Sequence, residues 1–78
     1  MALIADFEER PLSPKRLHGE VTCGYKSVVV EGKRILQLET YGSPNRKEPG
    51  KISQSLQIDD RAARQLLNIL RSTFPNLD

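Results

Sequence analysis

Residues that could act in catalysis are few and lie far apart along the chain. A nucleophile paired with a base would need Cys23 or a serine beside His18, and no third group that would orient the base is indicated. Adjacent carboxylates occur as Glu8-Glu9 and as Asp59-Asp60, and capping of a predicted helix explains the second pair. Glycine-rich phosphate motifs are absent, and one histidine cannot build a metal cluster. We therefore expect neither an enzyme nor a bound metal or cofactor.

Binding of an anionic chain has more support in the residues. Residues 10–58 carry nine basic and four acidic side chains, although the net charge of the whole chain is only +2. Basic groups neutralise phosphates, small polar side chains form hydrogen bonds, and a tyrosine can stack on a base. Lysines in hairpins and loops also serve solubility and protect sheet edges, so charge alone does not establish a site. The candidate nucleic-acid-binding residues are Lys26, Lys33, Arg34, Tyr41, Arg46, Lys47, Lys51, Ser53, Ser55 and Gln57, with Gln37 beside them.

The elements that would position these residues are predicted to form one small domain, preceded in the sequence by an N-terminal arm. Residues 1–16 are predicted to be a flexible arm, because Pro11 and Pro14 block a helix there, and residues 17–78 to be a single domain. A pattern typical of β-strands begins at Leu17, and Gly24 is predicted to mark either a bulge or a turn between two short strands. Further strands are predicted over 34–41 and 51–58, separated by a loop over 42–50. In the last strand Lys51, Ser53, Ser55 and Gln57 share a face that is expected to meet solvent or a ligand.

A hairpin turn is predicted at Glu31-Gly32, and its length is left open. A two-residue turn pairs Val29 with Arg34, whereas a three-residue turn with Gly32 in the left-handed region shifts that register. The choice decides which valines face the core, because a one-residue slip moves every side chain to the other face.

The C-terminal helix is the clearest element. Asp59 or Asp60 is expected to cap it, Arg71 complements its last turn, and Pro75 ends it. Its apolar arc of about 160° is wider than the stripe of about 100° that packing on one sheet requires. The excess predicts a second contact, either with a second copy through Leu66, Leu70 and Phe74 or with the arm through Leu3, Ile4 and Phe7. The arc consists of Ala62, Ala63, Leu66, Leu67, Ile69, Leu70, Thr73 and Phe74.

The small size of the chain favours self-association, and its single cysteine and N-terminal sequence favour an intracellular location. With 78 residues and a single cysteine, the domain has a small core and no internal disulfide to support it. No stretch is long enough to cross a bilayer, and the apolar start of the chain is followed by acidic residues, unlike a signal peptide. We expect a cytoplasmic homodimer that does not contact a membrane.

The order of strands and helix resembles the transcriptional positive cofactor four family over about residues 19–74. Residues 30–41 resemble its Gly-Lys hairpin and third strand, and residues 49–53 and 58–67 resemble its final strand and capped helix. The resemblance implies an α+β fold, in which a curved four-stranded antiparallel sheet precedes one C-terminal helix and dimers join through the helices. It implies low-specificity binding of single-stranded DNA and a role in transcription or DNA repair. Lys33 and Lys51 would then contact DNA, and Tyr41 would supply an aromatic ring.

Two positions depart from the family pattern and support a different function. A stacking aromatic of the family corresponds to Val30 here, and a tryptophan-type position corresponds to Gly42. These departures favour a protein–protein interaction module on the same fold that binds no nucleic acid. The basic middle segment favours binding of single-stranded nucleic acid, and the residues do not distinguish DNA from RNA.

Overall fold

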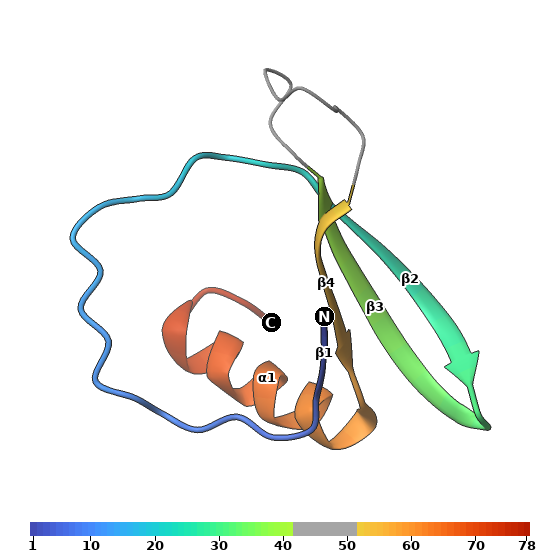
Figure 1. Cartoon of the computed structure of the whole chain (residues 1–78). Helices are drawn as coiled ribbons and strands as arrows, with labels where there is room; N and C mark the ends of the chain where they lie inside the picture. The colour runs from blue at the N-terminus through green and yellow to red at the C-terminus, as the bar shows by residue number, and fades with distance from the viewer. Residues whose placement is uncertain (42–51) are drawn as a thin grey trace.

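The computed structural model describes residues 1–41 and 52–78, which form one sheet and one helix (Figure 1). The elements are β1 (Ala2–Ile4), β2 (Cys23–Val30), β3 (Lys33–Tyr41), β4 (Ile52–Ile58) and α1 (Asp60–Thr73). The strands lie in the order β1-β4-β3-β2. The prediction of an α+β chain with a four-stranded sheet followed by one C-terminal helix is confirmed.

The sheet is mixed, so the expectation of a wholly antiparallel sheet is wrong. β2 pairs with β3 and β3 with β4 in antiparallel fashion, whereas β1 runs parallel to β4 with Ala2 opposite Leu56 and Ile4 opposite Ile58. β1 comes from the segment predicted to be an arm, and residues 17–22 form no strand. Two parallel strands need a long connection between them. The long segment without regular structure that follows β1 (blue in Figure 1) is part of this connection, and it allows β1 to pair with the edge of β4.

The turn between β2 and β3 contains two residues, which settles the register that the sequence leaves open. Glu31 has φ 51° and Gly32 has φ 78°, both in the left-handed region. Two such residues twist a hairpin in the sense that its strands require. Val29 lies opposite Arg34 and Val30 opposite Lys33.

The register divides the sheet into two faces. One face carries Leu36, Leu38, Leu56 and Ile58, with Leu36 opposite Ile58 and Leu38 opposite Leu56. The other face carries polar side chains over one half of its length. We call five of these the polar tract: Gln37, Glu39, Tyr41, Ser55 and Gln57.

The buried residues gather where β4 passes into α1. Ile35, Ile58 and Ala62 are at most 4% exposed, and Asp59 is 9% exposed. Leu36 of β3 lies opposite Ile58, the last residue of β4. Its neighbour Ile35 is therefore close to the β4–α1 junction, but its side chain is on the other face of the sheet from Ile58. Among the described residues the core is therefore small, as the composition predicts.

Asp59 is the N-cap of α1, one of the two residues predicted for this role. Its Oδ1 accepts a hydrogen bond of 2.9 Å from the backbone N–H of Ala62. Asp60 lies in the first turn and forms an exposed ion pair with Arg64. At the other end, Phe74 N–H donates to the carbonyl of Leu70, and the helix ends before Pro75 as expected.

Candidate nucleic-acid interface

The polar tract is joined by hydrogen bonds that run across and along the strands. Gln57 Nε2 donates to Gln37 Oε1 at 3.0 Å, and Gln37 Nε2 donates to Glu39 Oε2 at 2.7 Å. A longer contact of 3.5 Å joins Gln37 Nε2 to Ser55 Oγ. These bonds orient the Gln37 amide and the Glu39 carboxylate, because Gln37 both accepts from Gln57 and donates to Glu39, whereas Gln57 acts as a donor.

Tyr41 lies across the sheet over Gly24, which has no side chain. A Cβ built at Gly24 would lie 2.9 Å from the Tyr41 hydroxyl oxygen and 3.3 Å from its Cε2. Gly24 directly faces Glu39, so Tyr41 reaches it diagonally, a distance that an aromatic side chain can span. Gly24 therefore neither bends nor interrupts β2, contrary to the expectation of a bulge or turn. It makes room for the hydroxyl end of the Tyr41 ring, which a side chain at this position would crowd.

Only some of the predicted basic residues share this face. Lys26 lies opposite Gln37, and Lys33 lies on the same side of β3 as Gln37 and Glu39. Arg34 occupies the next position along β3 and therefore faces the other way. Arg46, Lys47 and Lys51, together with the predicted loop over 42–50, lie outside the described residues.

A shift in register moves Ser53 away from the polar tract. Thr40 lies opposite Gln54 but Tyr41 lies opposite Ile52, so one residue of β4 is extra at this point. The Ser53 hydroxyl lies 3.0 Å from the hydroxyl of Thr40, on the side away from Tyr41. Ser55 and Gln57 keep the face predicted for them, and Ser53 does not.

The polar tract borders a hollow at the edge of the sheet. Its volume is about 350 Å3, and β1 supplies one wall. The residues that line it are Met1, Ala2, Leu3, Gln37, Ser55 and Gln57. Two amide side chains of the tract thus meet a concave surface.

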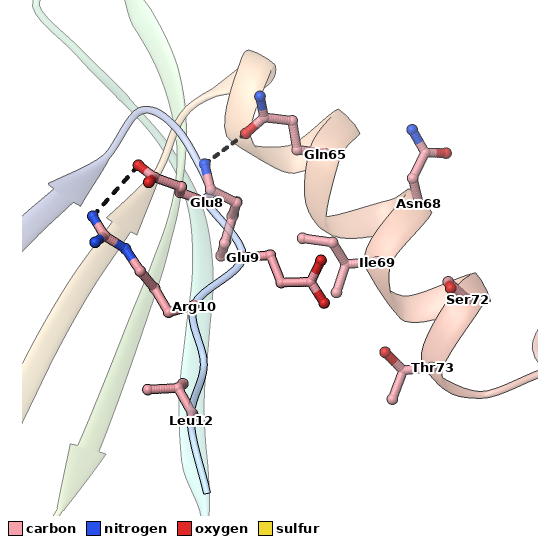
Figure 2. Close-up of a pocket in the computed structure, with 10 residues that line it drawn as sticks. Glu8, Glu9, Arg10, Leu12, Gln65, Asn68, Ile69, Ser72 and Thr73 are labelled. Atoms are coloured by element: carbon pink, nitrogen blue, oxygen red, sulfur yellow. Dashed lines mark hydrogen bonds and ion pairs between the residues drawn. The ribbon is translucent and has the colours of Figure 1, made fainter.

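The N-terminal segment also holds the first turns of α1. Gln65 accepts from the Phe7 N–H at 2.7 Å and donates to Asp6 Oδ1 at 2.8 Å, while Arg61 forms an ion pair with Asp6. After Phe7 the N-terminal segment moves away from α1 (Figure 2). Figure 2 shows Glu8, Glu9 and Arg10 across an open hollow of about 700 Å3 from Asn68, Ile69 and Ser72.

The apolar side of α1 is covered only near its start. Ala62 is buried and Leu66 is half-buried, but Leu67, Ile69, Leu70 and Phe74 are 36–54% exposed. Of the three arm residues considered as a cover, Leu3 is 49% exposed, whereas Ile4 and Phe7 are half-buried, with Phe7 bonded to Gln65 near the start of α1. The arm accordingly leaves the C-terminal half of the apolar arc open.

Sequence reasoning missed two parts of this arrangement. Glu39 was not among the candidate residues, although its spacing of two from Gln37 and Tyr41 in a predicted strand places all three on one face. Nothing in the sequence marks Gln65 as the anchor of the N-terminal segment, because the contact joins parts of the chain far apart in sequence.

No family profile, no curated protein and no solved structure matches this chain. Within residues 1–41 and 52–78, no helix is long and apolar enough to cross a membrane. In the same part of the chain, no three histidine, cysteine, aspartate or glutamate side chains gather as metal ligands would.

Proposed function

We propose that this chain is a homodimeric protein that binds single-stranded nucleic acid, DNA in the first instance, with low sequence specificity. The resemblance to the transcriptional positive cofactor four family supports this function and, with it, a role in transcription or DNA repair. The observation that carries the proposal is the placement of Tyr41. The hydroxyl end of its ring lies close to Gly24, on the same face as Lys26, Lys33 and the rest of the polar tract.

This face combines the groups that a single strand requires. An aromatic ring that is only half-buried, as Tyr41 is, can stack on any base, since every base has a π face. Lys26 and Lys33 carry the positive charge that phosphates require, and they lie toward the β2–β3 hairpin beside the polar side chains. Ser55 and Gln57 add hydrogen-bonding groups on the neighbouring strand.

The exposed apolar arc of α1 supports self-association. Leu70 and Phe74 are 36% and 54% exposed in the single chain, and Leu66 is half-buried beside them. Burial of apolar surface contributes about 25 cal/mol per Å2, so a second copy seated on this arc would supply what the small core lacks. The helices would then form the dimer contact and leave the polar tract open.

Fluorescence anisotropy with labelled oligodeoxythymidine at several salt concentrations tests the binding. Affinity should fall steeply with salt, with a slope of about −0.7 for each phosphate contact. Lys33→Ala and Lys51→Ala should each make the slope shallower and weaken all sequences alike. Tyr41→Ala should weaken binding by about 1–3 kcal/mol with almost no change in slope.

Lys15→Ala is the matched control, because Lys15 lies exposed in the segment before β2 and is not part of the sheet. Equal losses for Lys15→Ala and Lys33→Ala would mean diffuse attraction without a site on the sheet. Absence of binding at low salt would refute the proposed function. The same exposed arc of α1 would then favour the alternative, an interaction module that docks another protein on this fold.

A further inference from the structure

Glu39 is an unexpected residue for a surface that attracts phosphates. It lies in the middle of the polar tract, with Gly24 opposite on β2 and Ser55 opposite on β4. Its carboxylate is half-buried and accepts from Gln37 Nε2 at 2.7 Å through Oε2, and more distantly from the Tyr41 hydroxyl at 3.5 Å through Oε1. Donors on both sides therefore hold the two oxygens in a fixed orientation between the amide and the ring.

Such a carboxylate keeps acceptor capacity for a ligand. An ionised carboxylate offers about four acceptor sites, and one described donor occupies each oxygen here. A group held in this way binds with little further loss of side-chain freedom. The ligand it favours is one that presents two adjacent N–H donors.

The Watson–Crick edge of guanine is the base edge that fits this requirement. Guanine offers N1–H beside its N2 amino group, so both carboxylate oxygens can accept at once. Adenine and cytosine each offer one amino group next to an acceptor nitrogen, and thymine offers one N–H between two carbonyl oxygens that would repel a carboxylate. These edges are accessible in single strands, where the bases are unpaired.

We infer that Glu39 reads guanine in a bound single strand, with the neighbouring Tyr41 ring available for stacking on the same or the adjacent base. The inference rests on the proposed function and refines it, by adding a base preference to an otherwise sequence-tolerant surface. It also accounts for a negative charge on this face. Lys26 and Lys33 lie toward the hairpin, where phosphates would run, while Glu39 faces the position of a base.

The test compares oligodeoxythymidines in which one central base is thymine, guanine, adenine, cytosine or hypoxanthine, by anisotropy at a fixed low salt concentration. The wild type should bind the guanine oligomer about tenfold more tightly than the thymine oligomer, a typical value for one bidentate contact. Hypoxanthine lacks the N2 amino group and should lose most of this preference. This comparison needs no variant, so a folding defect cannot obscure it.

Glu39→Gln should reduce the guanine-to-thymine ratio to near one and raise the affinity for oligodeoxythymidine, because a negative charge is removed from the surface. Glu20→Gln is the matched control. Glu20 lies exposed before β2, so its loss removes the same charge and should leave the guanine preference intact. Binding without a guanine preference, or a preference that survives in Glu39→Gln, would overturn the inference alone. Failure to bind any oligomer would overturn the proposed function and the inference together.

Discussion

Replacement of Asp59 by alanine should destabilise the chain more than replacement of its neighbour Asp60. The Asp59 carboxylate is almost buried and accepts a 2.9 Å bond from the N–H of Ala62, which is itself fully buried. Loss of an N-cap costs about 1 kcal/mol and up to about 2. We expect about 2 kcal/mol here, because water cannot readily reach the N–H that loses its partner.

Asp60 provides the internal comparison. Its ion pair with Arg64 is 3.0 Å long, but both side chains are 79% exposed, and its other contribution is a charge near the helix N-terminus. Exposed pairs of this kind are worth a few tenths of a kcal/mol. Asp60→Ala should therefore be nearly neutral.

Urea unfolding followed by circular dichroism measures this difference. For a slope of about 1 kcal/mol per molar urea, typical of a small domain, Asp59→Ala should lower the midpoint by about 2 M. All variants must be compared at one protein concentration, since self-association would stabilise the folded state. Asp59→Asn retains an oxygen acceptor and should recover most of the loss. Equal losses for Asp59→Ala and Asp60→Ala would refute the assignment of the cap.

Three further predictions follow from other contacts. Leu70→Asp places a charge on the exposed apolar arc and should halve the mass in sedimentation; an unchanged mass, whether one chain or two, would count against the helix contact. Gly24→Ala brings a methyl group to within 2.9 Å of the Tyr41 hydroxyl oxygen, so it should displace the ring, visible as a change in its NMR shifts, and weaken oligonucleotide binding. Gln65→Ala removes the acceptor of the Phe7 N–H and should speed hydrogen exchange at that amide, whereas an unchanged rate would mean that the N-terminal segment is held elsewhere.

Local signals in the sequence predict the parts of the fold that depend on neighbouring residues. The cap at Asp59, the turn at Glu31-Gly32 and the alternation in β3 follow from residue type and spacing. Each involves contacts within a few positions, where propensity and geometry agree. The wide apolar arc of α1 was visible in the same way, and the structure leaves much of it exposed.

The parts that could not be predicted depend on contacts between distant segments. The three apolar residues of β1, Ala2–Ile4, do not indicate that this segment pairs with β4 or in which direction, because its partner lies more than fifty positions away. The displacement of Ser53 comes from one extra residue in β4, which alternation alone does not reveal. Glu39 was not predicted, because attraction of phosphates favours positively charged residues, whereas Glu39 is a negatively charged hydrogen-bond acceptor.

The pairing of β1 with β4 also determines the order in which the sheet can assemble. The β2–β3 hairpin joins residues adjacent in the chain, so it can form within microseconds. β1 leaves the ribosome first but must wait for β4, since Ala2 pairs with Leu56. Closing so large a loop slows the search, and the open backbone of β4 can meet strands of other molecules in the meantime. Aggregation during refolding should therefore depend on how quickly β1 docks, rather than on the stability of the finished sheet.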